Sequence, residues 1–346
     1  MIILIAVWLA IIIISPETAI LAARESAGVW AASVMPSLFP YLALSLLLVS
    51  YISGRPGRAN KGGIASVMVL GMLGGSPAGA KLLLTNHANQ PLAPRAAQAV
   101  SAAITTASPM FILGTATDWL GGTVLADGTR MLAAHIVAAL FVGGAMYALN
   151  ISADKSTGLS DANVSVKERA QRHSSDRSAD PPQRLAFGEA ISQAAITMLT
   201  VCGCMIIFNV TLACLARLFP PVSDGVLAVF AGFFEMAGGC AKLSQLNLGT
   251  SRTAAALSAC VSFGGLSVFL QNAAYLTKLP VKLLPQLAAK LVSAVISYII
   301  TRALYGETLF IIIAAGMAAA FVLIYLFHLT SFSSLRLRRS WLASSM

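Results

Sequence analysis

The sequence predicts an all-α membrane protein of two inverted-topology halves, with about eight transmembrane helices and two re-entrant helical hairpins. The composition predicts that the chain lies in a membrane. Of 346 residues, 57% are hydrophobic and 10% are charged, whereas soluble domains carry about 25% charged residues. Repeated apolar segments of about 20 residues predict several crossings. Glycine-rich interruptions at corresponding places in the two halves predict the hairpins.

The N-terminal half covers residues 1–150. Its apolar segments fall at about 2–22, 34–53, 62–84, 96–117 and 131–150. The first has no basic n-region and no convincing cleavage site, so we expect a retained span rather than a signal peptide. Pro36 and Pro40, near the start of the second, predict a helix boundary.

A polar linker, residues 151–184, separates the halves. It is rich in Ser, Asp, Arg and Lys, and it has too few large apolar residues to fold alone. The C-terminal half, residues 185–330, precedes a basic tail at 331–346. Its apolar segments fall at about 188–216, 224–248, 253–275, 284–303 and 308–329.

Short loops rich in Lys and Arg predict the orientation, because such loops stay in the cytoplasm. Basic residues cluster at 55–61, in the linker and in the tail, whereas the loop at 118–130 has Arg130 against Asp118 and Asp127. We therefore expect a bacterial inner-membrane protein with both termini in the cytoplasm and the loop at 118–130 outside.

This orientation requires that one apolar segment in each half fails to cross. The better candidates are 62–90, broken by Gly74-Gly75-Ser76-Pro77, and 224–248, which contains Glu235 and Gly238-Gly239. Unpaired backbone groups are tolerated in a membrane only where protein or water surrounds them. We expect two re-entrant hairpins that enter from opposite sides.

The two hairpins share a pattern. The first reads Gly74-Gly75-Ser76-Pro77-Ala78-Gly79-Ala80-Lys81-Leu82, and the second Glu235-Met236-Ala237-Gly238-Gly239-Cys240-Ala241-Lys242-Leu243. Each is followed by a span with its own break, at Ser108-Pro109 and at Ser262-Phe263-Gly264-Gly265. Inverted halves with interrupted helices are typical of secondary transporters.

These motifs resemble the YlbJ family of sporulation integral membrane proteins. The resemblance covers about 30 to 305 and includes Pro36-Ser37-Leu38-Phe39-Pro40, both hairpin motifs and both breaks. It implies a nucleoside-recognition (Gate) domain, a fold similar to that of concentrative nucleoside transporters, and movement of a small metabolite during spore formation. Dipicolinate is the substrate that the family suggests.

The predicted substrate site lies at the hairpin tips and the two breaks. Lys81 and Lys242 would either neutralise an anionic substrate or extend toward water. Glu235 would bind a coupling ion, H⁺ or Na⁺, or pair with Lys242. The predicted substrate-binding residues are Ser76, Pro77, Gly79, Lys81, Ser108, Pro109, Glu235, Gly238, Gly239, Lys242, Ser262, Gly264, Gly265, Gln271 and Asn272.

Several of these polar residues also have structural explanations. Ser76, Ser108 and Ser262 could cap broken helices. Gln271 and Asn272 are adjacent, so at most one of them should face a cavity. His135 is expected to make a structural hydrogen bond rather than to relay protons.

The sequence favours a secondary transporter for a small anionic or aromatic metabolite, either dipicolinate or a nucleoside-like solute. The alternative is a scaffold or assembly protein of the spore envelope. No catalytic motif suggests an enzyme, and we expect no cofactor and no metal. The net charge of +10 lies in loops and does not predict nucleic-acid binding. The sequence leaves open whether the protein forms a homo-oligomer.

Overall fold

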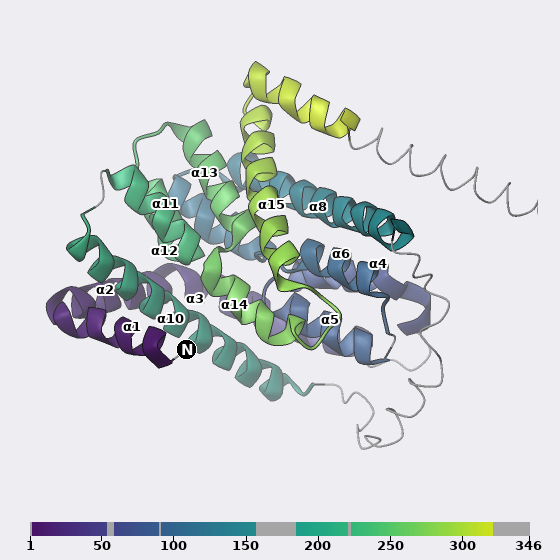
Figure 1. Cartoon of the computed structure of the whole chain (residues 1–346), viewed down its shortest axis with the longest axis horizontal. Helices are drawn as coiled ribbons and strands as arrows, with labels where there is room; N and C mark the ends of the chain where they lie inside the picture. The colour runs from purple at the N-terminus through teal and green to yellow at the C-terminus, as the bar shows by residue number, and fades with distance from the viewer. Residues whose placement is uncertain (1, 54–58, 90, 157–184, 221–222, 321–346) are drawn as a thin grey trace, which may run out of the picture.

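The computed structural model describes residues 2–53, 59–89, 91–156, 185–220 and 223–320. Regular structure in these ranges is entirely helical (Figure 1). Most of the predicted linker and the whole basic tail lie outside the described residues.

The chain begins with a short helix and a long one. Ser15 separates α1 from α2, because the proline at 16 disfavours helical geometry in the residue before it. The predicted span at 2–22 is therefore divided. These elements are α1 (Ile2–Ile14), α2 (Pro16–Val29), the π-helical turn η1 (Trp30–Val34) and α3 (Met35–Ser53).

The expected helix boundary at Pro36 and Pro40 is wrong, because the helix runs on from η1 into α3: Pro36 is the second residue of α3, and Pro40 lies inside it. Proline lacks the N–H that an α-helix uses. The π-helical turn just before Pro36 changes the backbone pairing there, and such turns accommodate local interruptions within helices.

The rest of the N-terminal half is a helical hairpin followed by an interrupted helix. The hairpin is α4 (Ala59–Gly74) and α5 (Ala78–Asn89). Residues 105–108 interrupt the next helix, and α8 continues to Ser156, into the predicted linker. The elements after the hairpin are α6 (Pro94–Ile104), η2 (Phe111–Ala116), α7 (Thr117–Leu120), η3 (Val124–Gly128) and α8 (Thr129–Ser156).

The C-terminal half repeats this order. After the long α10, a hairpin breaks at Glu235 and the next helix breaks at Gly264. These elements are α10 (Phe187–Leu218), α11 (Asp224–Phe234), α12 (Met236–Ser244), α13 (Thr250–Phe263), α14 (Gly265–Leu276), α15 (Leu283–Leu304) and a final helix, Thr308–Ala320.

Each half contributes a long helix to the contact between them. α8 and α15 cross near the centre of the molecule, and α10 lies along α2 and α3 (Figure 1). The main core cluster joins α3 and η2 of the first half to α10, α12 and α13 of the second. The core therefore lies where the two halves meet.

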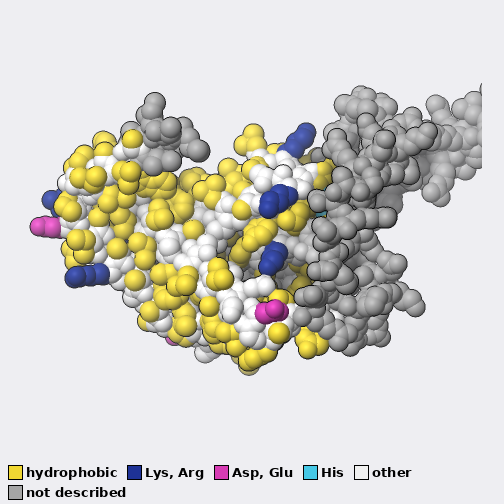
Figure 2. All heavy atoms as spheres, turned by 90° about the horizontal axis from the view of Figure 1, so that it is seen from below, with side chains coloured by type: hydrophobic (Ala, Val, Ile, Leu, Met, Phe, Trp, Pro, Cys, Tyr) yellow, Lys and Arg dark blue, Asp and Glu magenta, His cyan; other side chains and the backbone are white. Residues whose placement is uncertain are grey.

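The protein is a membrane protein by the length and composition of its helices. Five helical runs are long and apolar enough to cross a bilayer, namely Pro16–Tyr51, Val124–Leu149, Phe187–Leu218, Thr250–Leu276 and Leu283–Leu304. Shorter apolar helices lie at Ile64–Gly74, Asp224–Phe234 and Thr308–Ala320. Figure 2 shows a face with widespread hydrophobic side chains and few charged ones. This surface suits contact with lipid.

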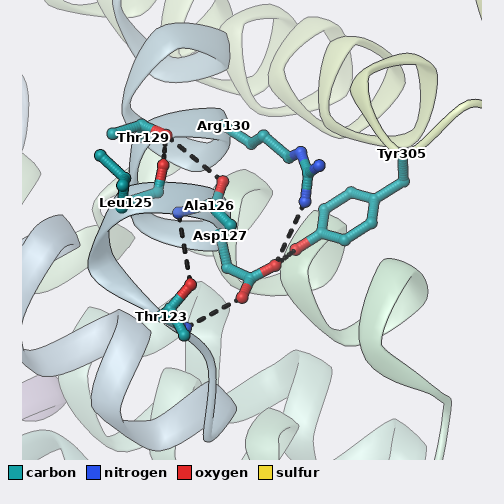
Figure 3. A network of polar contacts seen from close by, with 7 residues as sticks. All are labelled: Thr123, Leu125, Ala126, Asp127, Thr129, Arg130 and Tyr305. Carbon is teal, nitrogen blue, oxygen red and sulfur yellow. Dashed lines mark hydrogen bonds and ion pairs between the residues drawn. The ribbon is translucent and has the colours of Figure 1, made fainter.

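A polar network joins the start of α8 to the chain just after α15 (Figure 3). The hydroxyl of Tyr305 donates to Oδ1 of Asp127 at 2.5 Å, and the Arg130 guanidinium lies 4.8 Å from the centre of the Tyr305 ring. Burial, reinforced by the Asp127 carboxylate, raises the pKa of Tyr305 to about 12. The phenol therefore stays protonated at neutral pH and keeps this bond between the halves.

Candidate functional site

A cavity of about 70 Å³ lies where both hairpin tips and both helix breaks meet. By volume it has room for roughly five waters. Its walls also include α3 and α10. The lining residues are Val34, Leu38, Tyr41, Leu42, Gly74, Ser76, Thr105, Ala107, Ser108, Phe111, Thr197, Met198, Val201, Glu235, Met236, Ala237, Val261, Gly264, Ser267, Val268 and Gln271.

The first hairpin tip packs against the break in its own half. The amide of Ser76 donates to the carbonyl of Thr106 at 2.6 Å. Gly75 has a φ of +64°, and a Cβ placed there would lie 2.7 Å from the backbone nitrogen of Ser108. Only glycine fits this position without strain. Ser108 also accepts a bond from the amide of Phe111 at 3.3 Å, so its expected capping role is present.

The second hairpin tip is organised by Glu235. Its carboxylate accepts bonds from the amides of Ala237 (2.9 Å) and Gly238 (2.6 Å), and the residue is 3% exposed. A carboxylate at a helix N-terminus is stabilised by both the free amides and the helix dipole. Gly265, at a φ of +76°, lies close to the backbone of Glu235. In this half too, the tip packs on the break.

A side-chain bond joins the halves beside the cavity. Nδ2 of Asn272, on α14, donates to Oγ of Ser76 at 3.0 Å. Asn272 is 3% exposed and lies outside the cavity wall, whereas the adjacent Gln271 lines the cavity and donates to Oγ of Ser267 at 3.3 Å. One of the two adjacent amides thus faces the cavity, as expected from their spacing on a helix.

The two lysines lie outside this cavity. Nζ of Lys81 donates to Oε1 of Gln193 on α10 at 3.0 Å. Lys242 lines a second cavity of about 140 Å³ between α2, α10, α11 and α12. The expected Glu235–Lys242 pair is absent from the ion pairs of the described residues, because the carboxylate binds backbone amides instead. Neither lysine brings its charge to the central cavity.

Other predicted residues serve helix packing around the tips. A Cβ on Gly79 would lie 2.6 Å from the carbonyl of Ile104, and one on Gly238 would lie 2.6 Å from the Asn209 amide. Gly239 packs against the backbone of Gly232. These glycines let the hairpins close tightly, and none of them lines the central cavity.

Three predicted residues fall next to the cavity without lining it. Ser262 bonds Nδ1 of His135 at 2.8 Å and does not cap α13. Pro77 follows Ser76 through a cis peptide bond at the start of α5. Pro109 begins the helical turn that directly follows the first break.

The sequence did not single out the polar groups behind the first break. Nζ of Lys290, on α15, donates to the carbonyls of Ala102 (3.4 Å) and Thr105. Gln286, one helical turn earlier, donates to Oγ1 of Thr105 at 3.2 Å. A charged residue in the middle of an otherwise apolar segment was the signal that could have identified Lys290.

The cavity is mainly apolar with a polar edge. Among the described residues that line it, Glu235 is the one that carries a charged group. Hydroxyl and amide groups come from Tyr41, Ser76, Thr105, Ser108, Thr197, Ser267 and Gln271. Within the described ranges, no cluster of three His, Cys, Asp or Glu residues could hold a metal ion. The wall suits a small, largely apolar solute with a few hydrogen-bonding groups.

The chain is similar to the sporulation integral membrane protein YlbJ of Bacillus subtilis (strain 168). The two are 24% identical over 327 residues, which cover 86% of this chain and 80% of that protein. No family model matches the chain. No solved structure matches it either. The similarity is weak but extends over most of both chains, and it supports the resemblance to the YlbJ family.

Proposed function

We propose that this protein is a secondary transporter whose substrate binds in the central cavity. The observation that carries the proposal is that two hairpin tips and two helix breaks, from opposite halves of the chain, line one cavity. Transporters place substrates near the middle of the bilayer, where interrupted helices supply free backbone groups. In this proposal eight segments cross, both hairpins are re-entrant, and both termini face the cytoplasm of a bacterial inner membrane.

Reciprocal helix packing supports two inverted halves. α6 packs on α8 of its own half and on α15 of the other, and α13 packs on α15 and on α8. The hairpin helices behave in the same way, since α5 contacts α14 and α12 contacts α7. Rocking of one half against the other would change these contacts together, which is what alternating access requires.

The cavity wall favours an aromatic, nucleoside-like solute over a free dicarboxylate. A second negative charge beside Glu235 is unfavourable in a site of low polarity, and Lys81 and Lys242 are too far out to compensate. A dicarboxylate such as dipicolinate would require a protonated Glu235. A role in spore formation follows from the similarity to YlbJ alone.

A ligand-induced thermal-shift screen tests the proposal. Purified protein in detergent is heated with inosine, uridine, adenine or dipicolinate. A solute present at 100 times its Kd stabilises the folded state by about 2.7 kcal/mol. We expect a shift with at least one of them, lost in Gln271→Ala and retained in Gln193→Ala, whose amide bonds Lys81 away from the cavity. No shift with any of the four would favour the scaffold alternative.

A further inference from the structure

Two basic side chains are buried together behind the first helix break. His135 of α8 is 2% exposed and Lys290 of α15 is 5% exposed. The charge of Lys290 acts on His135, and the backbone of Ala107 lies beside the imidazole. Ala107 and Thr105 both line the cavity. The two basic groups therefore lie directly behind the cavity wall.

Lys290 has no acidic partner in the described part of the chain. The ion pairs there are Arg130–Asp127 and Arg302–Glu307. Its ammonium instead donates to two carbonyls near the C-terminal end of α6, those of Ala102 and Thr105. A helix C-terminus favours a positive charge. A charge inside a membrane without a carboxylate is costly, and such residues commonly mark ion or proton pathways.

His135 has an open position for a proton. Its Nδ1 bonds Oγ of Ser262, and its buried Nε2 makes no hydrogen bond of normal geometry among the described residues, although the Ala107 backbone lies beside the ring. A buried polar atom without a partner needs an explanation, because most are paired. In the tautomer whose Nδ1–H donates to Ser262, the Nε2 lone pair of the neutral imidazole is free to accept a proton.

In the described part of the chain, the helices that pack on α15 place no acidic side chain beside the pair. α15 packs on α6, α8, α13 and α14. Near the pair, α6 offers carbonyls and hydroxyls, and α13 offers Ser258 and Ser262. The charged residues of α6 and α13, Arg95 and Arg252, stand at the starts of those helices. Besides His135, α8 carries Arg130 in its first turn and Asp154 and Lys155 in its last, and α14 carries no charged residue. Because the charge of Lys290 acts on His135, positive charges on both groups would repel each other strongly in this medium of low polarity.

We propose that Lys290 and His135 together form the site of the coupling proton, and that they hold one proton between them. This inference rests on the proposed transport function. With the proton on Lys290, its charge holds the carbonyls at the end of α6 and so fixes the break that lines the cavity. Loss of the proton weakens this hold and frees the break to move. Binding of the proton therefore changes the shape of the cavity, because the protonated Lys290 fixes the break and the neutral Lys290 releases it.

Amide hydrogen exchange tests the site without any solute. In the full-length protein, exchange at residues 103–111 is followed by mass spectrometry between pH 5.5 and 9 and corrected for the intrinsic pH dependence. We expect protection to fall about fivefold as Lys290 loses its proton. In Lys290→Arg, protection should not depend on pH, because arginine keeps its charge throughout. Lys278→Met removes an exposed lysine of the same half and should behave like the wild type.

Uptake into proteoliposomes then separates this inference from the proposed function. Labelled inosine and dipicolinate are tested with and without an imposed pH gradient. We expect the gradient to drive accumulation by the wild type, while Lys290→Arg retains exchange of solute without accumulation. pH-independent protection in the wild type, or gradient-driven accumulation by Lys290→Arg, overturns the proton site. pH-dependent protection with no uptake of either solute leaves the proton site standing and counts against transport.

Discussion

Glu235 is the residue that defines the chemistry of the cavity. A carboxylate in the middle of an apolar segment predicted a special role, and the structure shows that it caps α12 from the cavity wall. Its partners could not be read from the sequence. Lys242, two helical turns further on, was the obvious candidate, but the backbone turns at the tip and leaves the lysine in the second cavity.

Replacement of Glu235 by Gln should destabilise the protein although the shape is kept. The amide offers one acceptor oxygen, and its NH₂ group faces the second backbone N–H, which loses its partner. We expect the free energy of unfolding to fall by about 1–2 kcal/mol, measured by chemical denaturation in detergent.

Glu189→Gln is the matched control for this prediction. Glu189 accepts a bond from the Ala186 amide at 2.9 Å at the exposed start of α10, where Gln serves equally well. An equal loss of stability in both variants would contradict the cavity cap.

Helix breaks were predictable at the scale of elements, because Gly and Pro interrupt helices for local reasons. Gly75, Pro77, Pro109 and Gly264 all stand at observed breaks. The direction in which each helix faces was not predictable. Lys81 and Lys290 both lie in apolar segments, but only the structure shows that the second is behind the cavity wall.

Gly75→Ala should damage the first hairpin tip. Its φ of +64° and the Ser108 backbone nitrogen 2.7 Å from the added Cβ both oppose a side chain. We expect a loss of about 1–3 kcal/mol in the free energy of unfolding. Gly203→Ala on α10 meets nothing within 4 Å and should be neutral or slightly stabilising. Similar stabilities for the two variants would show that the tip does not pack as described.

The end of α15 should make stability depend on pH. Nε of Arg302 donates to Oε1 of Glu307 at 2.5 Å. The hydroxyl of Ser251 donates to the same oxygen at 2.7 Å. The guanidinium lowers the pKa of Glu307. A carboxyl group whose pKa is lowered by folding stabilises the protein above its unfolded pKa of about 4.3, and this contribution is lost as the pH falls through the folded value.

We therefore expect the melting temperature of the wild type to fall between pH 6 and pH 3 more steeply than that of Glu307→Gln. Thermal unfolding in detergent at several pH values provides the measurement. Parallel curves for the two proteins would contradict this role of the ion pair.

Composition and segment length predicted a helical membrane protein at the scale of the whole molecule, since both reflect the thickness of the bilayer. The number of membrane crossings was harder to predict from the sequence. The segment at 2–22 divides at Ser15, and α2, η1 and α3 run on without a break. The meeting of both tips and both breaks at one cavity depends on contacts between residues such as Ser76 and Asn272, which are far apart in the chain.

Uptake of labelled inosine and dipicolinate by proteoliposomes tests most directly whether a solute crosses through the central cavity. Thr197 lines the cavity, whereas Thr200 on the same helix is exposed, and each bonds the carbonyl four residues earlier. Phenylalanine at 197 should fill the cavity, and phenylalanine at 200 should project outward. We expect uptake of at least one solute by the wild type and by Thr200→Phe, and only background uptake by Thr197→Phe. Equal uptake by both variants, or none above protein-free liposomes in the wild type, would contradict transport through this cavity.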